Sequence, residues 1–127
     1  MATYVRFETP YRCETNGQPL GVFRAVPCLR ERVSLTNWAQ EMLDGSLDWF
    51  NEHLPVPESG EMDRRAIFWF HRPSEIVREM WYLVWILREE GLHVKLRRTS
   101  IPGRIVYRDD FQVAAIPYGD GLRRWRA

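Results

Sequence analysis

The chain has 127 residues, of which 45% are hydrophobic and 28% are charged, and its formal net charge is +1. This length and composition predict one globular domain, because a chain of this size buries a core without disulfide or metal staples. They exclude a wholly disordered chain, and no apolar run approaches the roughly 20 residues of a membrane-spanning helix. A near-neutral charge also lacks the strongly basic footprint of a dedicated nucleic-acid-binding domain.

The N-terminal segment and the cysteines indicate the compartment. The segment MATYVRFETPY is charged and alternating, unlike the apolar centre of a secretory signal peptide. Cys13 and Cys28 are the only cysteines, and they lack the CxxC spacing of zinc and redox sites. We therefore expect a cytoplasmic protein whose thiols stay reduced. Two features favour a bacterial source: the chain is small, and its positive charges are arginines everywhere except at Lys95.

The N-terminal quarter predicts one strand, a loop and an interrupted apolar segment. Residues 3–8 alternate between apolar and polar side chains, the pattern of a half-buried strand. Residues 9–19 hold two prolines, an asparagine and a glycine, which predict a loop. Pro27 lies within the apolar segment 20–31, where its missing N–H limits any helix to short pieces.

The centre of the chain predicts a helix followed by a buried strand. The helix is capped by Ser34 or Thr36 and ends near Leu54, before two prolines. Its apolar stripe consists of Ala39, Leu43, Leu47, Phe50 and Leu54. Residues 66–70 are apolar on both faces, which is typical of a central strand that is covered on both sides.

The clearest helix spans residues 74–90, with Gly91 just beyond its end, where left-handed geometry favours glycine. It is apolar almost all round, so we expect it to contact more than one neighbour. One apolar face consists of Ile76, Met80, Leu83 and Leu87, and a second consists of Val77, Trp81 and Trp85.

Residues 92–117 predict three strands in an antiparallel meander, with turns at Pro102-Gly103 and Asp109-Asp110. The resulting order, β-α-α-β-α-β-β-β, predicts an α+β single domain over residues 1–117. Its core is a mixed sheet of about five strands with helices packed on the sheet. Strands that are separated by helices favour parallel crossovers, whereas the final hairpins favour antiparallel pairs. Residues 118–127 are expected to form a basic, frayed C-terminal tail.

The aromatic content is the first functional signal, since the chain holds six Trp, five Tyr and six Phe residues. Trp is enriched at the energetic centres of protein interfaces. The predicted interaction residues, on the second face of helix 74–90, are Trp81, Tyr82 and Trp85. Two interpretations stay open. The face packs on the preceding helix through Trp38 or Trp49, or it binds a protein partner, with a homodimer as the leading case.

A second hypothesis places single-stranded nucleic acid on the sheet. If both turns of the meander contain two residues, one face collects basic side chains around an aromatic ring, so that phosphates meet arginines and a base stacks. The candidates are Arg97, Arg104, Arg108, Phe111 and, in the tail, Arg123, Arg124 and Arg126. The alternative is that the arginine stems cover apolar neighbours while their charged ends stay in water.

No catalytic residue, metal site or cofactor is predicted, because the chain contains no HExxH, GxSxG, GxGxxG or P-loop motif. A third hypothesis, a small enzyme, rests on His71, which follows the central strand and needs a carboxylate within hydrogen-bond reach. The sequence favours a non-enzymatic interaction or regulatory accessory module that uses the Trp-rich helix face. It predicts no association with a membrane.

Overall fold

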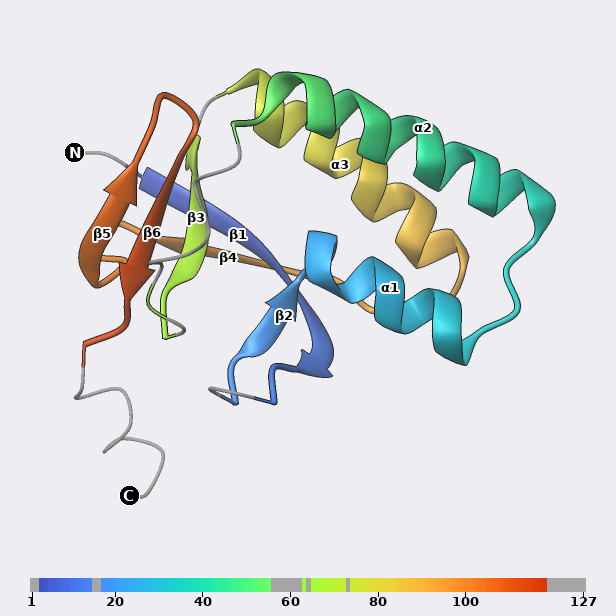
Figure 1. Cartoon of the computed structure of the whole chain (residues 1–127), viewed down its shortest axis with the longest axis horizontal. Coiled ribbons are helices and arrows are strands. Elements are labelled where there is room, and N and C mark those ends of the chain that lie inside the picture. The colour runs from blue at the N-terminus through green and yellow to red at the C-terminus, as the bar shows by residue number, and fades with distance from the viewer. Residues whose placement is uncertain (1–2, 15–16, 56–62, 64, 73, 119–127) are drawn as a thin grey trace.

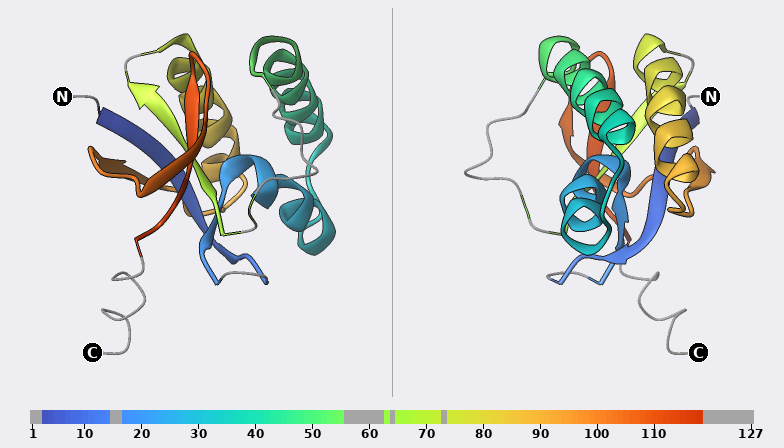
Figure 2. Two further views of the ribbon diagram at one scale, coloured as in Figure 1. Left: turned by 60° about the vertical axis from the view of Figure 1, so that its left-hand side comes forward. Right: turned by 90° about the vertical axis from the view of Figure 1, so that its right-hand side faces the viewer.

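The computed structural model describes residues 3–14, 17–55, 63, 65–72 and 74–118. These residues form three helices on one side of a six-stranded sheet (Figures 1 and 2). The elements are β1 (Thr3–Arg12), β2 (Pro19–Gly21), α1 (Val22–Arg32), α2 (Asn37–His53), β3 (Ile67–Arg72), α3 (Glu75–Glu89), β4 (Lys95–Thr99), β5 (Arg104–Arg108) and β6 (Gln112–Ile116). The predicted α+β class, with helices packed on the sheet, is confirmed, and β2 is an additional short strand.

The sheet is built around β1. Along one edge, β1 pairs with β4; along the other edge it pairs with β3 near its start and with β2 near its end. β6 pairs with β3, and β5 pairs with β6. All these pairs are antiparallel, so among the described strands the sheet is antiparallel rather than mixed. The single helix α3 does connect two strands that run in the same direction, β3 and β4, but β1 lies between them.

The segment predicted as a loop over 9–19 is largely extended. β1 continues to Arg12, and β2 begins at Pro19. The pairing of these two strands is irregular between Glu8 and Arg12. Pro10 lies in this irregular stretch, where a residue without an N–H is tolerated because no regular ladder bond is lost. The proline and glycine signals therefore mark a bulged strand and a short turn instead of a long loop.

The predicted meander is wrong in its first pairing. β4 pairs with β1, so β4 and β5 lie on different parts of the sheet. The second hairpin, β5–β6, does form, but Arg108 faces Val113 instead of Phe111, and the pairing shifts between Ile105 and Tyr107. The irregularity between Ile105 and Tyr107 exchanges the faces of β5, so Arg104 and Arg108 lie on opposite faces of the sheet. The predicted gathering of these arginines on one face of the meander therefore does not hold.

Asp109 organises the turn between β5 and β6. Its carboxylate accepts hydrogen bonds from the Tyr107 hydroxyl, at 2.7 Å, and from the backbone N–H groups of Phe111 and Gln112, at 2.8 and 3.0 Å. Partial burial acts to raise the pKa of Asp109, but the donors, which include the Gln112 side chain, lower it below its ordinary value. The turn therefore spans residues 109–112 and is held by a side chain, which turn propensities alone do not predict.

The caps predicted for the two long helices are present. Thr36 accepts a hydrogen bond from the Ala39 N–H and begins α2, and Ser74 accepts one from the Val77 N–H and begins α3. Gly91, at φ +91°, follows the end of α3. The expectation that Pro27 restricts its segment to short pieces is wrong, because α1 runs for 11 residues with Pro27 inside. Its buried face offsets the missing N–H; that face consists of Val22, Ala25, Val26 and Leu29.

The main core lies between the helices and the sheet. Val5 and Phe7 of β1 and Phe70 of β3 point into it, together with the predicted face of α3, all of whose members are 1% exposed or less. The alternate residues of the same strands point to the other side, which carries none of the described helices (Figure 2). We call this side the open face. Trp69 lies on the open face, as one member of a small second cluster of buried residues.

Gly45 supplies a test of the helix assignment. It lies in the middle of α2, is exposed, and a Cβ added to it would meet no atom within 4 Å. Gly45→Ala is expected to raise the free energy of unfolding by about 0.5–1 kcal/mol, because alanine loses less backbone entropy in a helix. Urea unfolding followed by circular dichroism measures the change. A loss of stability would mean that helix α2 is interrupted at Gly45.

Candidate functional site

The outer surface of α2 and α3 carries exposed aromatic side chains. Trp81, Tyr82 and Trp85 are 41%, 45% and 46% exposed, and Trp38 of α2 is 43% exposed. We call these four residues the aromatic surface. The predicted first face of α3 fills the core. On the predicted second face Val77 is buried as well, so only Trp81 and Trp85 of that face are left at the surface.

The rings of the aromatic surface contact one another. Trp38 meets Trp85 edge to face at 5.6 Å between ring centroids, and Tyr82 lies 5.8 Å from Trp85. Trp81 packs its edge against Phe7 at 4.8 Å and lies beneath the Arg88 guanidinium. The expected packing of this face on the preceding helix is therefore present in part, since Trp38 contacts Trp85 of α3, but much of each ring stays in solvent. Trp49 does not take part and stacks on His53 instead.

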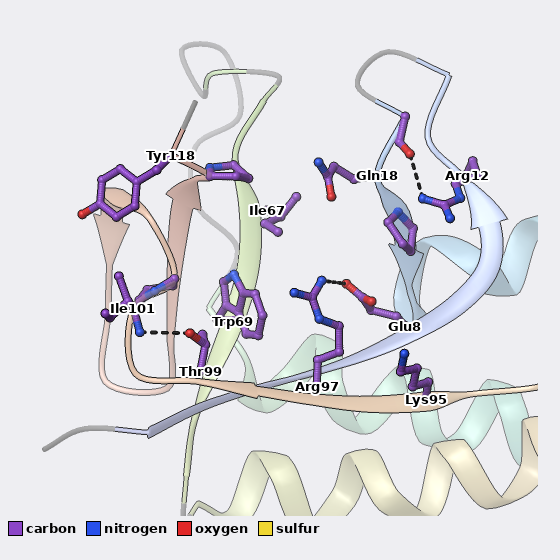
Figure 3. A pocket seen from close by; sticks show the side chains of 14 residues that line it. Glu8, Arg12, Gln18, Ile67, Trp69, Lys95, Arg97, Thr99, Ile101 and Tyr118 are labelled. Carbon is purple, nitrogen blue, oxygen red and sulfur yellow. Dashed lines mark hydrogen bonds and ion pairs between the residues drawn. The ribbon is translucent and has the colours of Figure 1, made fainter. Parts of the chain in front are cut away.

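A second site lies on the open face, where the curled sheet encloses a pocket of about 890 Å³ (Figure 3). Its floor comes from β1, β3 and β4, and its rims come from the turn before β2 and from the segments that precede β5 and follow β6. We call it the open-face pocket. The polar and charged side chains that line it are Glu8, Arg12, Gln18, Lys95, Arg97 and Thr99.

A buried charge network supports the floor of the pocket. Arg6 is 7% exposed, and its guanidinium donates to the Glu8 carboxylate at 3.1 Å. It also donates to the backbone carbonyls of Phe68 in β3, at 3.0 Å, and of Pro19 in β2, at 2.7 Å. Burial lowers the pKa of Arg6 below its ordinary value, and the neighbouring Glu8 opposes that shift. Arginine remains charged despite this, so the network keeps its ionic character.

Arg97 connects this network to the surface of the pocket. It donates to the same oxygen of Glu8 at 3.1 Å, and its guanidinium lies over the Trp69 ring at 5.5 Å. Trp69 is 3% exposed, and its indole Nε1–H has no hydrogen-bond partner among the described residues. A buried donor without a partner is uncommon in folded proteins. In Figure 3 the Trp69 ring lies beside Arg97 on the floor of the pocket.

The predicted nucleic-acid residues do not form one surface. By register, Arg97 opposes Arg6 and Arg108 opposes Val113, so both belong to the open face, whereas Arg104 opposes Ile116 and belongs to the other face. Phe111 is half-buried and packs against the helix-side core. The aromatic centre that was expected to accept a base is therefore not on the face of Arg97. The candidates Arg123, Arg124 and Arg126 lie outside the described residues.

His71 does not have the partner that the enzyme hypothesis needs. Its imidazole lies 5.2 Å from the Tyr4 ring, and no carboxylate of the described residues lies within hydrogen-bond or ion-pair distance of it. Its backbone N–H donates to the Phe111 carbonyl as part of the sheet. The described part of the chain also holds no group of three or more His, Cys, Asp or Glu side chains arranged to bind a metal ion.

Sequence reasoning missed the open-face pocket, including Glu8, Arg12 and Trp69. One signal was available: Arg6 and Glu8 alternate with Val5 and Phe7 in the strand that the structure places at the centre of the sheet. Two charged residues that lie two positions apart in a central strand are buried only where neighbouring groups form ion pairs or hydrogen bonds with them.

Comparison of the chain with protein-family models, curated proteins and solved structures gave no significant match. The fold is of the α+β class: among the described residues, an antiparallel sheet carries three helices on one face and the open-face pocket on the other. Within the described ranges, no helix has the length and apolar character needed to cross a membrane.

Proposed function

We propose that this protein is a non-enzymatic interaction module that associates with a second copy of itself through the aromatic surface. The observation that supports this is the gathering of large aromatic side chains, each 41–46% exposed, on neighbouring helices. With areas typical of Trp and Tyr, they leave on the order of 400 Å² of mainly apolar surface in contact with water. An apolar patch of this size is comparable to the largest one on a typical soluble monomer, and such patches are often functional.

The exposed side of α3 favours a second copy as the partner. Arg78 and Trp85 are both exposed and lie seven residues apart, so they share one stripe of the helix. In an antiparallel, two-fold pair of α3 helices centred between Trp81 and Tyr82, Arg78 of each copy faces Trp85 of the other. Each such cation–aromatic contact contributes about 0.5–2 kcal/mol, and the symmetry forms it twice.

The patch fits the centre of a two-fold interface. A stable dimer buries roughly 800 Å² on each partner, so the aromatic surface accounts for about half, with the surrounding polar residues of α2 and α3 as the rim. The nearest exposed side chains of α3 are charged and of both signs: Glu75, Arg78, Arg88 and Glu89. We propose that the module is a cytoplasmic accessory protein. Cys13 and Cys28, which would stay reduced there, form no disulfide in the structure.

The test is the mass of the purified protein in solution. The wild-type chain is expected to form a dimer of the 15.2 kDa subunit at micromolar concentration, measured by sedimentation velocity. Trp85→Glu is expected to weaken association at least about 30-fold, because loss of an interface centre costs about 2 kcal/mol or more. Arg78→Ala removes both symmetry-related contacts and is expected to weaken association at least about fivefold if the helices pair antiparallel.

A matched control separates this effect from a general loss of solubility. Val106→Glu adds the same charge at an exposed apolar residue of β5 that is not part of the aromatic surface. It is expected to leave the dimer intact, and circular dichroism should show that both glutamate variants are folded. A wild-type chain that stays monomeric at about 100 μM, or a Trp85→Glu variant that dimerises like the wild type, would overturn the proposal.

A further inference from the structure

We propose that the open-face pocket binds a small organic anion, with its carboxylate or phosphate group held by Arg12, Lys95 and Arg97 and its apolar body against the Trp69 side. This goes beyond self-association, because the pocket and the aromatic surface lie on opposite sides of the sheet. Figure 3 shows the pocket side chains on the side of β1 and β4 that faces away from the helices. A volume of about 890 Å³ is in the range of small-molecule sites.

The charges of the lining favour an anion. Three cationic side chains and one carboxylate line the pocket. The carboxylate, Glu8, is already neutralised by Arg6 beneath it and by Arg97 beside it. Lys95 has no ion pair among the described residues, and Arg12 donates only to the Gly17 carbonyl, at 3.1 Å. The positive charge at the mouth is therefore uncompensated, and a partly enclosed site strengthens its attraction for an oxyanion.

Trp69 supplies a reporter for the site. Its ring lines the pocket but is only 3% exposed, and its indole nitrogen is shielded from solvent, so an occupant does not contact the N–H directly. The Arg97 guanidinium lies over the ring, 5.5 Å from its centroid. An anion that binds Arg97 therefore changes the surroundings of the indole, and the Trp69 signal reports that binding.

The rest of the lining is mostly apolar. Ile101 is 68% exposed, and Tyr118 is 55% exposed, although both line the pocket. Pro19, Pro102 and Pro117 complete the apolar rim. Exposed isoleucine and tyrosine side chains beside a polar floor are suited to cover a flat or apolar ligand body.

The experiment titrates the full chain with chosen probes and follows the indole N–H signals by nuclear magnetic resonance. The chain has six tryptophans, and Trp69→Phe identifies the signal of Trp69. The probes are adenosine 5′-monophosphate, benzoate and, as a neutral body, adenosine; oligothymidylate tests nucleic acid. The two anions are expected to shift the Trp69 signal saturably with dissociation constants of about 1 mM or tighter, and adenosine is expected to bind at least about tenfold more weakly.

Matched charge reversals locate the site. Lys95→Glu and Arg12→Glu are expected to weaken binding of the anions at least about tenfold, whereas Arg104→Glu, on the other face of the sheet, is expected to leave it unchanged. The Trp85→Glu variant is expected to bind as the wild type does, so failure of the dimer proposal and failure of this proposal are distinguishable.

Three results would overturn this proposal. One is the absence of a saturable shift of the Trp69 signal with either anion up to about 10 mM. Another is unchanged affinity in Lys95→Glu and Arg12→Glu. The third is a shift with oligothymidylate alone that falls steeply with added salt, which would assign the face to single-stranded nucleic acid instead.

Discussion

Arg6→Met is expected to lower the free energy of unfolding by about 3–5 kcal/mol, because it removes the more deeply buried of the two cationic partners of the Glu8 carboxylate together with the donor to two backbone carbonyls. β1 changes its partner along one edge at this residue: β3 pairs with it up to Val5, and β2 pairs with it from Glu8. The Arg6 guanidinium occupies the gap and donates to a carbonyl of each of these strands. Without it, two backbone carbonyls and Glu8 lose a buried donor.

A double variant separates the ion pair from the strand contacts. In Arg6→Met/Glu8→Leu no charge is left buried, so the ionic part of the loss is expected to disappear. The carbonyls of Phe68 and Pro19 still lack their donor, and a loss of about 1–3 kcal/mol should remain. Guanidinium unfolding measures both variants, with exposed Arg12→Met as the control. A single variant that loses less than about 1 kcal/mol would contradict the structural role of Arg6.

Gly103→Ala is expected to destabilise the protein by more than about 2 kcal/mol, through both backbone strain and collision. Gly103 has φ +128°, a region that side-chain-bearing residues rarely adopt. A Cβ there would collide with the Ile116 carbonyl oxygen and lie 2.8 Å from the carbonyl carbon. The collision is with backbone at the end of β6, and moving it would break the pairing of Arg104 with Ile116.

Two other glycines calibrate this loss. Gly91 also has a positive φ, of +91°, but a Cβ there would meet no atom within 4 Å. Gly91→Ala is therefore expected to cost only the strain, about 1–2 kcal/mol. Gly45→Ala, without strain or collision, is expected to stabilise. Thermal unfolding of the three variants should give this order. Equal losses for Gly103→Ala and Gly91→Ala would mean that the end of β6 relaxes to accept the methyl group.

The two proposed surfaces are compatible in one molecule. The aromatic surface lies on the helices, and the open-face pocket lies beyond the sheet from them (Figures 2 and 3). A dimer through α3 would leave both pockets open. Binding of an anion and association can therefore be measured separately, and any coupling between them would appear as a change of dimer stability with ligand.

The two long helices, α2 and α3, were determined by the local sequence. Thr36, Ser74 and Gly91 mark the ends of α2 and α3 through side-chain caps and a left-handed residue, which involve neighbours within four positions. The apolar stripe of α3 likewise assigned its buried face correctly. These signals succeed because helix hydrogen bonds and helix faces connect residues close together in the chain.

Only the tertiary structure decided the sheet and the pocket. Glu8 and Arg97 are separated by 89 positions, yet they share one hydrogen bond because β4 pairs with β1 instead of β5. Strand pairing depends on which free edge a distant segment reaches, and a slip of one residue exchanges its faces. The sequence alone determined that α3 carries more apolar and aromatic surface than a single stripe facing the core requires. The tertiary structure decided which aromatic rings stay in water and which charged residues meet, because both depend on contacts between distant segments.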